Sequence, residues 1–435
     1  FGGEGETLYG AGGSLAAAAP WKKILVLLAG PVANLLLAYL IYAGLLFWLF
    51  VVFFVPVWWS VTYLTDWRPY TIAAVLLLAS YPGRLPKRYG IADLLVGIFF
   101  AAALLPVLVG GSSVGSVFGL LTNTMLRYLL GRSLLEVAAA AGIYTAMAIT
   151  GAVAGGLGIA EFLLDFHPWS LIGPRNALYH IWGSIQYRAG LPRSEGAFGH
   201  SIAFACTLAL VLPMIFAAKF STRTRLVLTG LVMGGIVFSF SRGGLFSAAL
   251  CLVLVALFGG SSFAKQARNT ALLGLTGATL VVLPFITDVF ALAGSEASDS
   301  AGYRGQLFDL VATMPMVGAS ASSVTLNGER YYAGFRSIDS QLIMTGLNYG
   351  WLAMLIGAVL VFLAAVNVAR GQATAAMVAV VGQIPAILSV AAITQYSMAF
   401  WFTVGLAVAG QMAVAATAVT TAPESQPAAA DLSPG

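Results

Sequence analysis

The sequence predicts an all-α fold, a polytopic integral membrane protein of roughly 12 transmembrane helices. Three observations carry this prediction: 60% of the 435 residues are hydrophobic, only 9% are charged, and long apolar runs alternate with short polar links. An average soluble chain is about a quarter charged. Only helices and closed barrels satisfy every backbone polar group in lipid, and barrel strands alternate in polarity, whereas these runs are uniformly apolar.

The expected spans follow from the apolar runs in chain order. They fall at about 24–56, 69–82, 91–109, 113–127, 134–158, 201–218, 225–240, 243–259, 271–292, 341–366, 375–393 and 396–418. The runs at 69–82 and 113–127 are short for a hydrocarbon core of about 30 Å, so we expect them to be tilted, re-entrant or partly interfacial. Residues 1–23 then form a cytoplasmic N-terminal segment, 24–420 the transmembrane domain, and 421–435 a disordered Pro/Ala/Ser-rich tail.

Basic residues predict the orientation of the chain. If the spans alternate, every lysine falls on one side, together with Arg127 and Arg132, and the positive-inside rule makes that side cytoplasmic. The opposite side has no lysine but eight arginines, namely Arg68, Arg175, Arg188, Arg193, Arg242, Arg304, Arg330 and Arg336. It also carries two long loops, at about 159–200 and 293–339, and loops of that length are often functional.

Arginine without lysine indicates binding of a phosphate or carboxylate, because the planar guanidinium binds such groups with two parallel hydrogen bonds and keeps its charge. The arginines do not cluster with aromatic residues in a soluble domain, so we expect no nucleic-acid partner. Cys206 and Cys251 lie inside expected spans and give no disulfide or metal signal. No compact metal-ligand motif is present, and we expect no metal and no cofactor.

Four stretches with polar residues converge on the arginine-rich side. They are the entry to the span at 201, the start of the span at 243, the outer part of the second long loop, and the approach to the span at 341. Their candidate functional residues are Arg193, Glu195 and His200; Arg242; Arg304 and Asp309; and Arg336 and Asp339.

These stretches resemble the O-antigen ligase and O-antigen polymerase family of bacterial membrane glycosyltransferases over about residues 90–366. The matching motifs are "RSEGAFGHS", "SRGG" and "IDSQLIMTGLNYG", in the family's order and on a common side. Ser201 stands where the family usually has proline, and Asp339 stands where ligases tend to have histidine. An acid at that position is more similar to the repeat-unit polymerases, so polymerase and ligase both stay open.

The resemblance implies transfer or polymerisation of undecaprenyl-diphosphate-linked glycan units onto an acceptor sugar hydroxyl, at the outer face of the bacterial cytoplasmic membrane. The alternative acceptor is a lipid or protein, as in a ligase. The leaving group is a lipid diphosphate, and cations aimed at its developing charge stabilise the transition state. Partners would be the lipid-linked donor, a glycan or lipid acceptor, membrane lipids and other polysaccharide-assembly proteins.

Each candidate residue has an assigned role and a structural alternative. For diphosphate binding we expect Arg193, Arg242, Arg304 and Arg336, and for acceptor activation Asp339, with Glu195 and His200 as rivals. Alternatively, Arg242 snorkels to lipid headgroups or caps a helix C-terminus, Asp339 caps a helix N-terminus, and His200 is a structural hydrogen-bonding residue.

A second resemblance covers only about the first 55 residues. "FGGEGETLYG" followed by "WKKILVLLAGPVANLLLAYLIY" is similar to the segment just after the zinc motif of the site-2 protease family. The H-E-x-x-H helix of that family is absent, so an active protease has no zinc ligands here. A fused fragment or a chance likeness explains the segment.

Two other function classes compete with glycan transfer. A transporter or flippase of envelope precursors needs charged sites or broken helices near the middle of the membrane, and the expected spans are nearly free of ionisable residues. A scaffold protein of the envelope machinery would not need arginines that face one way.

Overall fold

The computed structural model describes residues 19–63, 65–80, 86, 88–108, 118–258, 268–274, 276, 307–326, 329–335 and 338–420. The described chain is mostly helical, which confirms the helical part of the predicted fold class. Its longer helices are α1 (Pro20–Phe54), α2 (Pro69–Ala79), α3 (Ile91–Leu108), α5 (Leu126–Leu134), α6 (Ala140–Leu163), α8 (Ser201–Ala217), α9 (Thr222–Phe238), α10 (Arg242–Phe258), α13 (Gln341–Tyr349), α14 (Trp351–Ala369), α15 (Ala375–Gly382) and α17 (Thr394–Thr420).

Short elements fill the links between these helices. Helical ones are the π-helix η2 (Leu121–Met125), the 3-10 turns η3 (Pro168–Leu171), η4 (Gly196–Phe198) and η5 (Leu310–Thr313), and the six-residue helices α7 (Ala177–Trp182) and α16 (Ile384–Ser389). The described strands form three antiparallel hairpins, β1–β2 (Val61–Tyr63 and Thr65–Trp67), β3–β4 (Tyr187–Arg188 and Leu191–Pro192) and β5–β6 (Ser323–Leu326 and Glu329–Tyr332).

Three of the described helices are long and apolar enough to cross a membrane by length and composition. They are Ala140–Leu163, Trp351–Ala369 and Thr394–Val414. Other apolar helices are shorter, at 10–17 residues, and include α2, α8 and α10. Helices of membrane-spanning length and composition therefore support a membrane protein.

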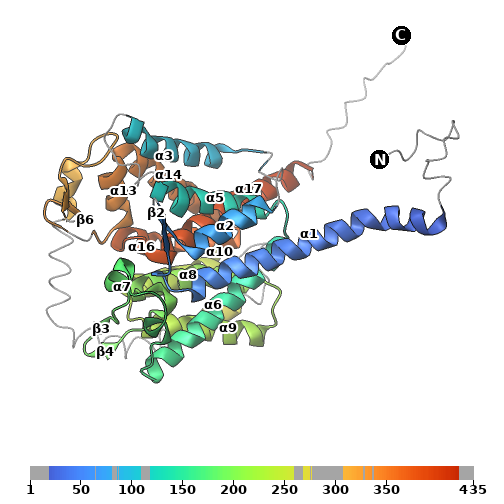
Figure 1. The fold of residues 1–435 in the computed structure, drawn as a ribbon, viewed down its shortest axis with the longest axis horizontal. Helices are drawn as coiled ribbons and strands as arrows, with labels where there is room; N and C mark the ends of the chain where they lie inside the picture. Colours follow the sequence, from blue (N-terminus) through green and yellow to red (C-terminus); the bar gives the residue numbers. More distant parts are fainter. Residues whose placement is uncertain are drawn as a thin grey trace, which may run out of the picture.

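Many of the helices run alongside one another, and several begin or end together at one end of the bundle (Figure 1). We call this the loop end: α1, α6 and α9 end there, and α8, α10, α13 and α17 begin there. Figure 1 shows β3–β4, α7, α13 and β6 on that side of the molecule, and the start of α1 and the end of α17 on the other side. Long-range bonds confirm the arrangement, since Gln395 at the start of α17 donates from Nε2 to the carbonyls of Val55, 3.2 Å away, and Ala197, 3.0 Å away.

Helix α8 lies at the centre of the bundle. Almost all its residues are buried, including Phe204 and Phe216, and it packs on α6, α9, α10, α15 and α17. Cys206 on α8 and Cys251 on α10 are free and buried, as small core residues. A helix surrounded by other helices must be apolar on every side, which is why its sequence shows no polar stripe.

Glycines allow two helix pairs to approach closely. A Cβ on Gly405 of α17 would lie 2.3 Å from the Tyr128 carbonyl oxygen of α5, and a Cβ on Gly155 of α6 would lie 2.4 Å from the Leu231 carbonyl oxygen of α9. Small residues at such contacts are typical of helix packing in membranes, where the apolar surroundings provide no hydrophobic force between helices.

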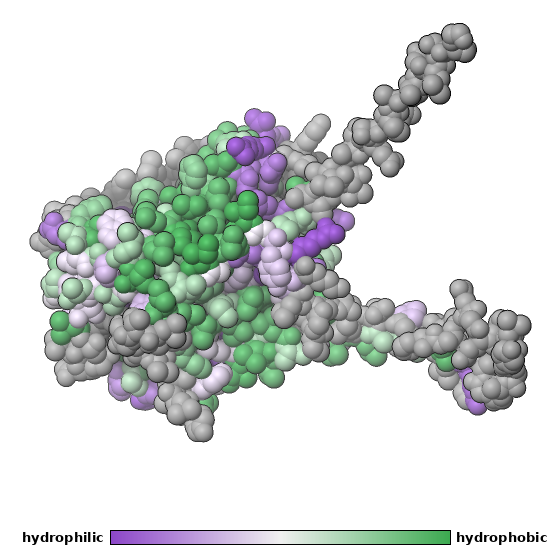
Figure 2. Space-filling model, turned by 90° about the horizontal axis from the view of Figure 1, so that it is seen from above, coloured by the Kyte–Doolittle hydropathy of each residue, from purple (hydrophilic) through white to green (hydrophobic). Residues whose placement is uncertain are grey.

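Large hydrophobic side chains also cover the outside of the bundle. On α3 and α14 these include Leu94, Leu105, Leu355 and Phe362, with 63%, 47%, 51% and 65% of their surface exposed. Figure 2 shows a broad hydrophobic area on the face that carries α3. Soluble monomers rarely expose contiguous apolar area of this kind, so the exterior suits a lipid environment.

Several expectations differ from the structure in their bounds. The segment predicted as a span at about 134–158 is α6, which continues to Leu163, so the first long loop is shorter than 159–200. Arg127 and Arg132, expected in a cytoplasmic link, are instead buried inside α5. Most of the N-terminal segment 1–23, part of the second long loop and the tail 421–435 lie outside the described residues.

Candidate functional site

The hairpin β3–β4 positions two of the arginines at the loop end. Ala189 and Gly190, at its turn, both have positive φ (49° and 78°), the backbone that a tight two-residue hairpin requires. The strands pair Arg188 with Leu191, and Arg193 follows directly, with its amide N–H donating to the Gln186 carbonyl at 2.9 Å. Arg188 and Arg193 therefore lie close together at this hairpin.

Both arginines bind the turn between α9 and α10. Arg188 donates from Nη1 to the carbonyl of Phe240 at 2.7 Å, and Arg193 donates from Nε to the carbonyl of Ser239 at 2.7 Å. The amide of Ser194 donates to the carbonyl of Phe238 at 3.0 Å. Cations favour the negative end of a helix, so these contacts stabilise the C-terminus of α9. Arg193 is thus a positioning residue for the turn that leads into α10.

Arg242 is the first residue of α10 and is half-buried. Ser241 caps this helix, its hydroxyl accepting the Gly244 amide at 3.1 Å. A positive charge at a helix N-terminus is unfavourable by itself, because the helix dipole is positive there. Arg242 therefore does not cap α10, and an anion at this position would interact favourably with both the guanidinium and the helix end.

The glycines of "SRGG" explain how Arg242 is placed. A Cβ on Gly243 would lie 2.7 Å from Val390 Cγ2 of the α16–α17 link, and a Cβ on Gly244 would lie 2.4 Å from Ala205 Cβ of α8. The two glycines thus let the start of α10 enter between α8 and the α16–α17 link.

A buried carboxyl pair lies beside the hairpin. Glu161, near the end of α6, accepts at Oε2 from the amides of Glu195 at 3.1 Å and Gly196 at 3.0 Å, and its Oε1 lies 2.8 Å from Nδ1 of His167. Glu195 is only 4% exposed, and its Oε2 has no hydrogen-bond partner among the described residues.

The environment of Glu195 favours its protonated form. Burial raises its pKa and the Glu161 carboxyl raises it further, to about 9, against the lowering effect of Arg193. Glu195 is therefore a neutral acid near pH 7, able to donate a proton but unsuited to accept one.

The environment of His200 lowers its pKa instead of raising it. Burial and the nearby Arg193 lower its pKa to about 4, so the ring is neutral near pH 7. Its Nδ1 accepts from the Ile202 amide at 3.3 Å, which makes it the N-cap of α8, and its ring packs edge-on against Trp182 with centroids 6.0 Å apart. Gly199, with φ of 62°, supplies the turn before the cap. These contacts favour the structural role of His200 as a hydrogen-bonding residue.

Asp339 precedes α13 without capping it. Ser340 is the N-cap, its hydroxyl accepting from the Ile343 amide at 3.3 Å, and Asp339 is half-buried just before it. The Gln341 amide donates to the Val390 carbonyl at 2.8 Å. Since Val390 also contacts Gly243, one residue of the α16–α17 link connects the starts of α10 and α13, next to Arg242 and Asp339.

The structure thus gathers five of the seven predicted site residues at the loop end: Arg193, Glu195, His200, Arg242 and Asp339. Arg304 and Arg336 lie outside the described residues, and so does the side chain of Arg330. Asp309 is described and is exposed. Among the described residues, no group of three His, Cys, Asp or Glu side chains could hold a metal ion.

Sequence reasoning missed three contributors at this end. Arg188 was counted but given no role, and Glu161 was counted within a loop, although an acid in an otherwise apolar helix is a signal of function or structure. Arg68, just before α2, was likewise counted among the eight arginines and given no role. It lines a cavity of about 230 Å³ together with Asn123, Trp182, Thr394 and Ser397.

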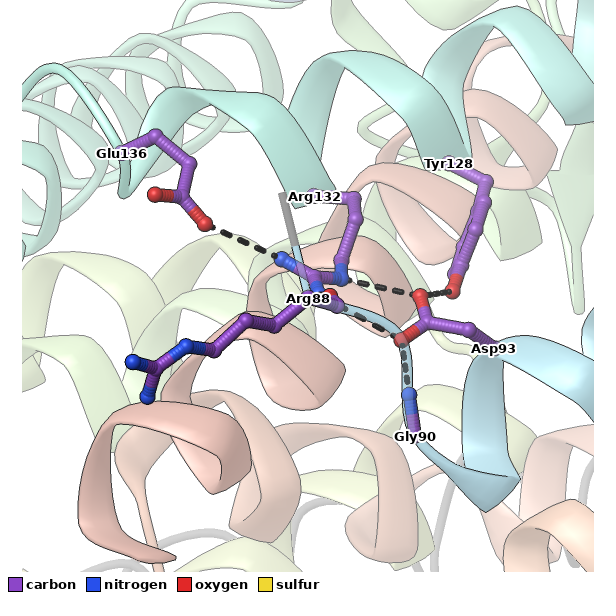
Figure 3. A network of polar contacts seen from close by, with 6 residues as sticks. All are labelled: Arg88, Gly90, Asp93, Tyr128, Arg132 and Glu136. Atoms are coloured by element: carbon purple, nitrogen blue, oxygen red, sulfur yellow. Dashed lines mark hydrogen bonds and ion pairs between the residues drawn. The ribbon is translucent and has the colours of Figure 1, made fainter. Parts of the chain in front are cut away.

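A separate polar network closes the opposite end of the bundle (Figure 3). Arg132 of α5 donates from Nε to Asp93 Oδ1 of α3 at 2.9 Å and from Nη2 to the Arg88 carbonyl at 2.6 Å, and the Tyr128 hydroxyl donates to the same Asp93 oxygen at 2.7 Å. Asp93 also accepts from the Gly90 amide at 3.0 Å. Every partner of the buried ion pair is thus within the protein, which suits a structural role in joining α3 to α5.

No protein family, curated protein or solved structure matches this chain.

Proposed function

We propose that the protein is a membrane glycosyltransferase that transfers or polymerises glycan units from an undecaprenyl-diphosphate carrier. The proposal rests first on the resemblance of "RSEGAFGHS", "SRGG" and "IDSQLIMTGLNYG" to the O-antigen ligase and polymerase family. In this proposal the loop end faces the extracytoplasmic side of the bacterial cytoplasmic membrane, and the chain crosses the membrane roughly 12 times.

The observation that carries the proposal is the position of Arg242. It begins α10 on a turn whose three preceding carbonyls are bound by the 188–194 segment. A guanidinium and a helix N-terminus then offer donors to one anion, and a leaving diphosphate gains negative charge as the glycosidic bond breaks. Arg304 and Arg336 remain proposed as further diphosphate ligands.

Proton transfer completes the proposed reaction. The acceptor hydroxyl must lose a proton as it attacks the donor sugar, and Asp339 is the proposed base, because Glu195 is protonated and His200 caps a helix through Nδ1. Arg193 acts through the turn rather than on the substrate. The acceptor is a sugar hydroxyl of the growing glycan for a polymerase, or a lipid or protein for a ligase.

The glycan profile of a deletion strain tests this function. A polymerase predicts chains that stop at one repeat unit, and a ligase predicts full-length chains that stay on the carrier lipid. A plasmid copy of the wild type should restore the profile. A normal profile in the deletion strain would contradict the proposed function.

A transporter or flippase of envelope precursors is the second candidate, and two observations favour it. Helix α15 ends at Gly382 and α16 begins at Ile384, so the helix is broken at the fully buried Gln383. Arg127 is also fully buried within the bundle, contrary to the expectation that the spans are nearly free of charge. Broken helices and buried charges are typical of transport sites. Accumulation of lipid-linked precursors on the cytoplasmic side of a deletion strain would favour transport over transfer.

A further inference from the structure

The cavity beside Arg68 is rich in hydrogen-bond donors. We call it the Arg68 cavity. Its polar lining comes from the residue before α2, from the π-helix η2, from α7 and from α17: Arg68, Asn123, Trp182, Thr394 and Ser397. Of the five N–H groups of a guanidinium, only Nη1 of Arg68 has a bond in the described chain, to the Tyr70 hydroxyl at 2.7 Å. The Thr394 hydroxyl is buried without a hydrogen-bond partner among the described residues, and no lining residue is acidic.

A second guanidinium, that of Arg127, lies beside the same tyrosine ring as Arg68. Arg127 is fully buried, donating from Nη1 to the Thr122 carbonyl at 2.8 Å and from Nη2 to the Thr71 hydroxyl at 2.9 Å. The guanidinium carbons of Arg68 and Arg127 lie 6.0 Å and 5.7 Å from the centre of the same Tyr70 ring. Neither arginine forms an ion pair with an acidic side chain in the described part of the chain. Two like charges beside one ring repel each other, and a nearby anion would offset that repulsion.

The backbone around the cavity is irregular where it supplies polar groups. Asn123 lies in the π-helix η2, and single π-helical turns are frequent at functional sites. Thr394, at the start of α17, has a φ of 47°, which is unfavourable for a β-branched residue. Its hydroxyl is buried without a partner. Strained backbone of this kind persists where the surrounding structure holds it, often at ligand sites.

We propose that the Arg68 cavity binds a phosphate group. Arginine offers paired donors that match the oxygens of phosphate, and the amide and hydroxyls offer further donors without a competing acid. The cavity is smaller than the roughly 300–1,000 Å³ that enclose drug-sized ligands, so it accommodates a headgroup rather than an oligosaccharide. The phosphate comes either from a lipid headgroup or from a free anion.

None of the described residues proposed for transfer lines the Arg68 cavity. The two sites adjoin the same α16–α17 link: Val390 contacts Gly243, next to Arg242, while Ala392 and Ile393 line the cavity. The inference does not depend on glycan transfer, since it concerns binding alone. A protein inactive in transfer but able to bind phosphate would leave it intact.

Phosphate binding is measured as a change in the melting temperature of the protein, purified in a neutral detergent. Tryptophan fluorescence reports the unfolding. The probes are inorganic phosphate, pyrophosphate, and micelles containing phosphatidate, each against sodium chloride at the same ionic strength. For the wild type we expect an upward shift of at least ~2 °C with one or more probes. Arg68→Gln and Asn123→Asp should weaken binding on the order of tenfold or more and remove the shift.

Arg175→Gln is the matched control, because Arg175 is an exposed arginine of the loop end that stacks on Tyr179, 4.1 Å from the ring centre, outside the cavity. It should keep the wild-type shift. A shift with phosphatidate alone identifies a lipid headgroup as the source, and a shift with the free anions identifies a soluble one. If Arg68→Gln does not fold, Asn123→Asp decides. The proposal is overturned if no probe shifts the wild type, or if the folded cavity variants keep its shift.

Discussion

Arg193 donates from Nε to the backbone carbonyl of Ser239 at 2.7 Å, which joins the segment before α8 to the turn that starts α10. The two residues are 46 positions apart, so this contact links two motifs that the sequence presents separately. It also gives Arg193 a positioning role at the turn before Arg242, while its expected role as a diphosphate ligand stays a prediction.

Replacing Arg193 with lysine tests that positioning role. Arg193→Lys keeps the charge but removes the Nε–H group, so the buried Ser239 carbonyl loses its donor. We expect a loss of about 1–3 kcal/mol in the free energy of unfolding, seen as a lower melting temperature. The exposed Arg175→Lys should leave the melting temperature unchanged. Equal melting of Arg193→Lys and the wild type would mean that this contact does not stabilise the turn.

Glu195→Gln tests the buried neutral carboxyl through pH. The pKa of Glu195 rises from 4.5 to about 9 on folding, so unfolding releases a proton between these values and its contribution to stability falls as pH rises. The slope is at most about 1.4 kcal/mol per pH unit. Glutamine cannot ionise, so Glu195→Gln should gain stability relative to the wild type as pH rises.

The useful window for this measurement is pH 6.5 to 9. Below 6.5 the lowered pKa of His200 adds an opposite effect, because unfolding then takes up a proton. Melting curves of both proteins across the window give the difference directly. A constant difference would show that Glu195 ionises normally in the folded protein.

The contact of α5 with α17 depends on Gly405. A Cβ there would lie 2.3 Å from the Tyr128 carbonyl oxygen and 2.7 Å from the Arg132 amide nitrogen, both backbone atoms that cannot move aside alone. Gly405→Ala should therefore destabilise the protein by about 1–3 kcal/mol. Gly230→Ala in α9, where a Cβ meets nothing within 4 Å, should be neutral or stabilising. Similar melting temperatures for both variants would contradict the close packing of α5 on α17.

Asp339→Asn separates chemistry from folding at the start of α13. If Asp339 activates or orients the acceptor, turnover should be lost while binding of the lipid-linked donor is preserved. Its neighbour provides the control: Ser340→Ala removes the N-cap of α13, costing about 1 kcal/mol of stability, without changing the acid. Unchanged turnover in Asp339→Asn would assign the base to another residue.

Much of the architecture could be predicted because lipid imposes simple rules. The helical structure follows from the apolar composition. The alternation of the expected spans predicts that Arg193, Glu195, His200, Arg242 and Asp339 lie at one end, where the structure has them. The glycines of "SRGG" and "RSEGAFGHS" were visible as motifs, but their reasons, close contact of Gly244 with α8 and the positive φ of Gly199, appear only in three dimensions.

The missed features depend on contacts between distant residues. Arg127 was expected in a link because one apolar run ends at it and the next begins at 134, but its bonds to Thr71 and Thr122 satisfy it inside the bundle. The carbonyl contacts of Arg188 and Arg193 could not be foreseen, since any exposed carbonyl is a candidate acceptor. The pKa of Glu195 depends on Glu161, which is 34 residues earlier in the chain.

The central claim is that Arg242 stabilises a lipid diphosphate as it leaves. Purified protein in lipid nanodiscs, supplied with a lipid-diphosphate-linked glycan and an acceptor, gives the transfer rate. Arg242→Lys retains one charge but loses the guanidinium fork, so we predict a rate on the order of 10²–10³-fold lower with an unchanged melting temperature, whereas Arg175→Lys should keep the wild-type rate. A wild-type rate in Arg242→Lys would contradict the claim.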